Sequence, residues 1–300
     1  MTLSSFEKAV LLSISYSSVF SFPLTSREIW LRLIYKQPIS HQRVKEVLDS
    51  LILKNIIQTN GKYFSILDDC STDIRKISQN FSNLKRSEAD SFVDKARLIP
   101  FIKAIVITGS VSVNNAKQND DIDWLIITKK DTLWIVRPLV ILLAIISGKR
   151  RERNGNHRDN SWCFNMFLSE ESLEVIDKNK NIYTAYELFQ ADFVYDQGGI
   201  ERKFLANNSW AKKYLANYWL EKNKRLTLDK VCFCEEKNAN LTQCFKYLNI
   251  VSFYIQYQYM KKAITREIVQ IDKALFHPRN THRNILTQWK KIIKQISNAY

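Results

Sequence analysis

Two apolar runs of strand-type composition, residues 104–108 and 122–128, constrain this chain more than any other feature. Val, Ile and Trp at such positions favour β-strands. Gly109 and Ser110 follow the first run directly, and Asp121 stands immediately before the second. We therefore expect two neighbouring strands, with a glycine turn at the end of one and acidic side chains at the start of the other.

Asp121 and Asp123 are two residues apart at the start of the second run. Side chains alternate along a strand, so both carboxylates project to one face while Ile122 and Trp124 turn to the other. The same alternation turns Asp120 away, and we expect no role for it. Two carboxylates held side by side can bind a hard divalent cation, of which Mg²⁺ is the expected one.

Gly109 and Ser110 suit a phosphate. Glycine lets the backbone approach a ligand closely, and a helix that begins near Ser110 would direct free N–H groups at the ligand. A phosphate turn beside metal-binding acids is what transfer from a nucleoside triphosphate requires. Either pair alone can equally be a solvated turn; both together, each attached to an apolar run, favour the functional interpretation.

The Gly109-Ser110 pair followed by Asp121 and Asp123 resembles the signature of the DNA polymerase beta-type nucleotidyltransferase superfamily, over about 25 of 300 residues. The resemblance implies that Gly109 and Ser110 hold a nucleoside triphosphate and that Asp121 and Asp123 are catalytic and bind Mg²⁺. The expected order of strands and helices gives an α+β fold with a small mixed sheet.

The third carboxylate that active members of that superfamily place on a later strand is not evident here. The expected strand, residues 162–168, contains no Asp or Glu. Alternation puts Cys163, Asn165 and Phe167 on one face, so Asn165 is the polar group nearest the expected place. An amide cannot act as a general base. Glu170 and Glu171 follow the run and could reach the site only if the strand were shorter than expected.

Residues 4–67 predict a small unit of three helices and a hairpin. The expected helices end near Ser18, run from Thr25 as N-cap to Ile34, and run from Ser40 as N-cap to Lys54. Asn60-Gly61 between two short apolar runs predicts a hairpin turn. This order resembles a winged helix-turn-helix.

Two roles are open for this unit. The third helix carries polar residues that could contact a DNA major groove, namely His41, Gln42, Arg43 and Lys45. Alternatively the unit packs against its own neighbour or another protein, through the aromatic residues Phe20, Phe22, Trp30 and Tyr35.

We expect four segments along the chain: a winged-helix-like module at 1–70, a connecting helix at 71–98, a nucleotidyltransferase-like domain at 99–200 and a basic helical region at 201–300. The third segment is expected to form a small mixed sheet with helices on one face, including a buried helix at 132–147. From Leu173 onward the pattern predicts only helices, among them 183–189, 207–215, 240–262, 264–275 and 281–297.

Charge is concentrated in the last third of the chain. Residues 201–300 hold 19 Lys and Arg against 7 Asp and Glu, which is +12 of the chain's +15. Such a region could attract nucleic acid, although a lysine-rich helical surface is often only a solvated one. The aromatic residues there are expected to be core, and His277 and His282 are not expected to bind metal. Sequence around Glu187, Trp210 and His277-Pro278 is similar to uncharacterised bacterial members of the superfamily.

Bulk properties indicate a globular chain, with 45% apolar and 25% charged residues. The five cysteines follow no secreted framework, so reduced thiols and a cytoplasmic location are expected. No signal peptide is expected, and the uninterrupted apolar part of the most lipid-like segment, 139–146, is far shorter than the ~20 residues that span a bilayer. We expect no membrane association.

Two hypotheses follow. In the first the chain is a Mg²⁺-dependent nucleotidyltransferase that moves a nucleoside monophosphate from a nucleoside triphosphate to an unidentified acceptor. In the second it is a non-catalytic, nucleotide-sensing regulator that binds DNA and carries a degenerate transferase site. The absent third carboxylate and the basic last third favour the second.

Overall fold

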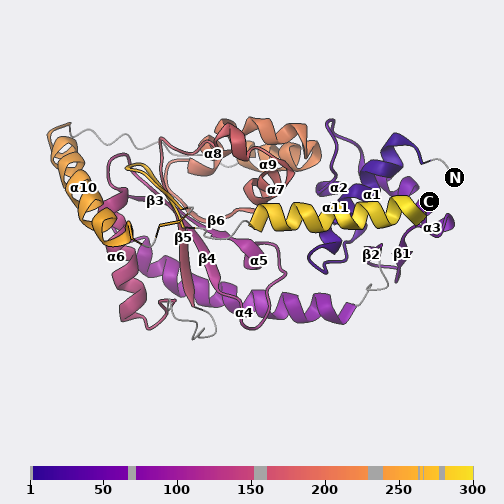
Figure 1. The fold of residues 1–300 in the computed structure, drawn as a ribbon, viewed down its shortest axis with the longest axis horizontal. Coiled ribbons are helices and arrows are strands. Elements are labelled where there is room, and N and C mark those ends of the chain that lie inside the picture. The colour runs from indigo at the N-terminus through magenta and orange to yellow at the C-terminus, as the bar shows by residue number, and fades with distance from the viewer. Residues whose placement is uncertain are drawn as a thin grey trace.

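A computed structural model describes residues 3–66, 72–151, 161–228, 239–262, 264–265, 267–276 and 281–299. These residues form an α+β structure with eleven α-helices, a six-stranded mixed sheet and a separate two-stranded hairpin (Figure 1). The strand order in the large sheet is β6-β3-β4-β5-β8-β7.

The N-terminal part contains α1 (Ser5–Ser18), α2 (Ser26–Leu31), α3 (His41–Leu53) and the hairpin of β1 (Gln58–Thr59) and β2 (Phe64–Ser65). Thr25 and Ser40 cap their helices as expected, and Gly61 adopts the positive φ that the turn requires. Helix α2 ends earlier than Ile34. The backbone of Tyr35 instead pairs with the chain around Leu215, which competes with a further helical turn.

The centre of the sheet matches the expected strands. β3 (Ile102–Thr108) and β4 (Ile122–Thr128) are antiparallel, with Thr108 opposite Asp123. β5 (Trp162–Ser169) runs parallel to β4, with Cys163 opposite Asp123. The polar ends of three elements therefore meet at one end of the central strands.

Helices cover both faces of the sheet, so the expectation of helices on one face was wrong. One face packs against α4 (Thr72–Ala96), α6 (Leu133–Ile146) and α10 (Ala239–Met260). The other packs against α7 (Ile182–Gln190), α8 (Ile200–Asn207) and α9 (Ala216–Leu228), which lie above the sheet in Figure 1. The physical reason is in β3 and β4, which are apolar at almost every position and need cover on both sides.

The chain after Leu173 is not purely helical, contrary to expectation. β6 (Asp192–Asp196) pairs with β3, and the segment expected as a helix at 264–275 supplies β7 (Ile268–Val269) and β8 (Lys273–Leu275). β8 pairs with β5, so the last third of the chain completes a sheet begun far earlier. Short segments of this kind take their conformation from the edge they pair with, which local periodicity does not reveal.

The remaining C-terminal expectations have mixed outcomes. The segment 207–215 is not one helix, because α8 ends at Asn207 and a 3₁₀ turn covers Ser209–Lys213. The last helix, α11 (Thr281–Ala299), is present as expected, whereas His277-Pro278 lies outside the described residues. Helix α6 is buried on its inner face only, since Leu142 and Ile146 are exposed. No helix in the described part of the chain is long and apolar enough to cross a bilayer.

The N-terminal part docks on the rest of the chain. The rings of Tyr16 and Tyr186 stack with their centroids 4.3 Å apart, and Tyr16 belongs to the core above the sheet. The Trp289 indole of α11 donates to Ser15 Oγ at 2.8 Å. Helix α11 runs alongside this part of the molecule, so both chain ends lie at one end of the structure (Figure 1).

Intramolecular docking, one of the two roles considered for this part, is therefore present. Asn217 of α9 reinforces it by donating to the Trp30 carbonyl at 2.7 Å. The polar face of α3, with Gln42, Arg43 and Lys45, stays exposed.

Candidate functional site

Gly109 lies against Asp123. It is the first residue of α5 (Gly109–Ser112), which follows β3 directly, and it has φ +68°. A Cβ atom at position 109 would lie 2.7 Å from Oδ2 of Asp123, which is closer than real Cβ contacts. The turn thus needs glycine for its backbone conformation and for the space that the carboxylate occupies. α5 is one turn long, so it lacks the macrodipole of a longer helix.

Asp121 and Asp123 lie on the face of the sheet that α7 covers. Asp121 directly precedes β4. Asp123 shares one face of β4 with Leu125 and Ile127, which pack in the core on the α7 side. Asp123 Oδ1 accepts a hydrogen bond of 2.6 Å from the amide of Asn165 on β5. Asp121 Oδ2 lies 3.1 Å from Nε of Arg151.

The two carboxylates repel one another. Burial, and after it the charge of Asp121, raises the pKa of Asp123 to about 6. The neighbouring Cys163 thiol, the charge of Arg151 and the hydrogen bond from Asn165 act in the opposite direction. A divalent cation between such carboxylates would relieve both the desolvation and the repulsion.

Ser110 is oriented by Asp120. The Ser110 hydroxyl donates to Oδ2 of Asp120 at 2.6 Å, and the backbone N–H of Lys117 donates to the same oxygen at 3.0 Å. Asp120 therefore closes the connection between β3 and β4 and is no bystander, contrary to expectation. To donate a hydrogen bond to a phosphate, the Ser110 hydroxyl would have to leave Asp120.

The third strand contributes an amide and a thiol. Cys163 donates from Sγ to Oδ1 of Asn165 at 2.8 Å, which turns the NH₂ of Asn165 toward Asp123. Burial raises the pKa of Cys163 to about 12, so the thiol stays neutral. The expectation that Asn165 is the polar group of β5 nearest the aspartates is confirmed. The expectation that Phe167 shares its face was wrong, because β5 shifts register against β4 and Phe167 packs in the core on the α4 side. Glu170 and Glu171 lie at the opposite end of the sheet, where both contact Lys130.

Glu187 on α7 is a third acidic side chain at this site, and sequence reasoning did not assign it there. Burial raises the pKa of Glu187 to about 7, with the charge of Asp123 as the second cause. Tyr183 lies one turn earlier on α7, and its pKa is raised by burial, then by Glu187 and Asp123. A single acid in an otherwise uncharged helix was the only available signal, because α7 and β4 are brought together only in the tertiary structure.

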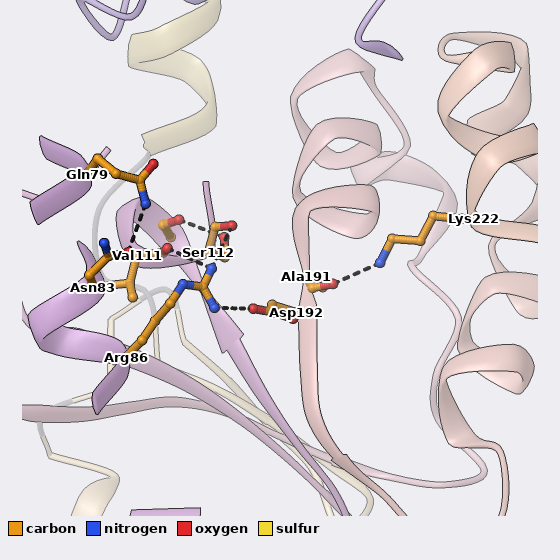
Figure 2. Close-up of polar contacts among 9 residues, drawn as sticks. Gln79, Asn83, Arg86, Val111, Ser112, Ala191, Asp192 and Lys222 are labelled. Atoms are coloured by element: carbon orange, nitrogen blue, oxygen red, sulfur yellow. Dashed lines mark hydrogen bonds and ion pairs between the residues drawn. The ribbon is translucent and has the colours of Figure 1, made fainter. Parts of the chain in front are cut away.

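Arg86 of α4 holds the elements around the site together. Figure 2 shows its guanidinium between the end of α5 and the start of β6. It donates to the carbonyls of Val111 at 3.1 Å and Ser112 at 3.2 Å, and it forms an ion pair with Asp192. Lys222 of α9 donates to the adjacent Ala191 carbonyl at 3.0 Å. The turn at Gly109 and the strand that follows α7 are thereby linked through one side chain.

The residues fit a metal that arrives with a substrate. Across the described ranges, no three His, Cys, Asp or Glu side chains converge into a preformed metal cage. Mg²⁺ is commonly bound through one or two carboxylates together with substrate phosphates, which Asp121 and Asp123 can satisfy.

Comparison of the chain with family models, with curated proteins and with solved structures finds no match in any of the three. Support for a function therefore comes from the geometry of the site.

Proposed function

We propose that this protein is a Mg²⁺-dependent nucleotidyltransferase of the DNA polymerase beta-like type, with an N-terminal winged-helix-like module. The contact between Gly109 and Asp123 carries the proposal. It brings the turn suited to phosphate within van der Waals distance of the carboxylate suited to metal, on adjacent strands. This geometry and the resemblance of the motif support the proposal.

In the proposed reaction Asp121 and Asp123 would hold Mg²⁺, and the Gly109-Ser110 turn would bind the triphosphate. The metal, when bound, neutralises phosphate charge and aligns the reacting oxygens. Asn165 keeps Asp123 in position through its 2.6 Å hydrogen bond. The acceptor oxygen bonds to the α-phosphorus, the bond to the bridging oxygen breaks, and pyrophosphate leaves with the electron pair.

Glu187 is our candidate for the proton acceptor. A carboxylate with a pKa of about 7 is suited to general-base catalysis near neutral pH. In this assignment Glu187 takes the proton of the acceptor hydroxyl, a role that the superfamily usually gives to a carboxylate on the third strand. The acidic group would then reach the site from a helix.

The direct test is transfer of label from α-labelled nucleoside triphosphates to RNA, protein or small-molecule acceptors in the presence of Mg²⁺. Asp121→Asn and Asp123→Asn are expected to reduce transfer by at least about 100-fold, as loss of metal-held charge stabilisation does. Glu171→Gln, which removes an acid at the opposite end of the sheet, is the matched control. Transfer that survives the double Asp121→Asn and Asp123→Asn variant contradicts the proposal.

A second candidate function is a DNA-binding, nucleotide-sensing regulator with a degenerate site. The exposed polar face of α3, which stays uncovered after docking, favours it together with the basic residues 201–300. It predicts duplex binding that weakens steeply with salt and that Arg43→Gln with Lys45→Gln reduces. Absence of binding to any duplex at low salt, with transferase activity present, leaves only the first function.

A further inference from the structure

Arg151 places a positive charge inside the candidate site. Its Nε lies 3.1 Å from Oδ2 of Asp121, and its Nη1 donates to Cys163 Sγ at 3.0 Å. The Asp121 side chain is 12% exposed and that of Arg151 is 41% exposed, so the guanidinium reaches the carboxylate from the solvent side. The backbone beside it is anchored, since Trp162 at the start of β5 donates its N–H to the Lys149 carbonyl at 2.7 Å.

The side chain itself is weakly held. Its ion pair with Asp121 is made through Nε, whereas a structural arginine commonly forms two parallel hydrogen bonds with a carboxylate. The second contact is to a neutral thiol, which is a weak acceptor. A partly exposed ion pair of this kind contributes little stability, so the guanidinium can leave Asp121 without a large penalty.

We infer that Arg151 is a counter-ion of Asp121 in the metal-free protein and a ligand of the nucleotide phosphates once Mg²⁺ is bound. The inference rests on the proposed function and adds a substrate-binding residue to it. Mg²⁺ and the guanidinium compete for the same carboxylate. Once displaced, the guanidinium stays beside the metal, where its planar donors match phosphate oxygens. Through this exchange the negative charge of the carboxylates has a cation beside it both before and after the substrate binds.

The exchange predicts that substitution of Arg151 raises the affinity for the metal alone and lowers the affinity for the nucleotide. Arg151→Gln removes the competing cation, so we expect Mn²⁺ alone, as a spectroscopic stand-in for Mg²⁺, to bind about fivefold more tightly. The same variant loses a phosphate ligand, so a nucleoside triphosphate with a non-hydrolysable α,β linkage should bind about tenfold more weakly with Mg²⁺ present. Paramagnetic resonance measures the first affinity and calorimetry the second, both without turnover.

Lys149→Gln is the matched control, because it removes one positive charge from the same segment while Lys149 pairs with Glu88 and not with Asp121. It should change both affinities less than about twofold, as expected for a screened surface charge. Arg151→Lys keeps a cation and loses the planar fork. It should retain wild-type Mn²⁺ affinity and weaken nucleotide binding, and it serves as the test variant if Arg151→Gln does not fold.

Unchanged or weaker Mn²⁺ binding by a folded Arg151→Gln variant overturns the counter-ion role. Unchanged nucleotide binding by Arg151→Gln and Arg151→Lys overturns the phosphate role. If the wild-type protein binds neither Mn²⁺ nor the nucleotide analogue at millimolar concentration, the proposed function fails and the inference fails with it. If the wild type binds both and the Arg151 variants match it, only the inference fails.

Discussion

The carboxylate of Asp123 fills the space beside Gly109: a Cβ atom added to residue 109 would lie 2.7 Å from Oδ2 of the aspartate. Gly109→Ala must therefore displace the carboxylate as well as strain a backbone at φ +68°. We expect a loss of about 2 kcal/mol in the free energy of unfolding, measured with urea, and loss of Mn²⁺ binding.

Gly61→Ala is the control for backbone strain alone. Gly61 has φ +87° with no atom within 4 Å of the added Cβ, so this variant should lose about 1 kcal/mol of stability and bind Mn²⁺ normally. A Gly109→Ala protein with wild-type Mn²⁺ affinity would show that the close contact is irrelevant to the site.

Asn165→Asp restores a carboxylate to the strand position where the resembled superfamily usually has one. In EDTA the added negative charge beside Asp123 should destabilise the protein by about 1–2 kcal/mol, which lowers the melting temperature by several degrees. Mg²⁺ should then stabilise this variant more than it stabilises the wild type. Equal stabilisation of both proteins by Mg²⁺ would argue that residue 165 is remote from the bound metal.

The buried acids predict a dependence of metal-free stability on pH. The pKa of Glu187 rises from 4.5 to about 7, so protonation favours the folded state. The favourable contribution is complete below about pH 4.5 and is lost as the pH rises through about 7. Glu187→Gln should accordingly stabilise the protein in EDTA at pH 8, by up to about 3 kcal/mol, and have little effect at pH 4.5.

Urea unfolding at the two pH values measures this difference. Glu171→Gln removes an exposed acid from the opposite end of the sheet and should alter neither value by more than about 0.5 kcal/mol. Equal effects of Glu187→Gln at both pH values would place Glu187 in a solvated environment.

The stacked pair Tyr16 and Tyr186 predicts that the N-terminal part and the rest of the chain unfold together. Tyr16→Ala should cost about 3 kcal/mol, because it removes a buried ring from the core above the sheet. Tyr16→Phe keeps the ring and should cost less than about 1 kcal/mol. Two separate unfolding transitions in the wild-type protein, with Tyr16→Ala affecting only one, would contradict this docking.

Local sequence determined the elements whose signals are contained within a few residues. Thr25 and Ser40 cap their helices because the capping bonds lie within one turn. Asn60-Gly61 makes its turn for the same reason. The sequence likewise predicted the apolar runs of β3 and β4, the shared face of Asp121 and Asp123, and the place of Asn165. Strict alternation failed further along β5, where a register shift turns Phe167 to the opposite face.

Only the tertiary structure decided the rest. β7 and β8 are strands because β5 offers an edge to pair with, and Asp120 holds Ser110 because the connection between β3 and β4 folds back on itself. Arg151 pairs with Asp121 from the segment after α6, and Glu187 of α7 lies near enough to Asp123 for the Asp123 charge to raise its pKa. Such contacts join residues far apart in the chain. Their free energy depends on burial and on distances in space, which no local pattern of residues records.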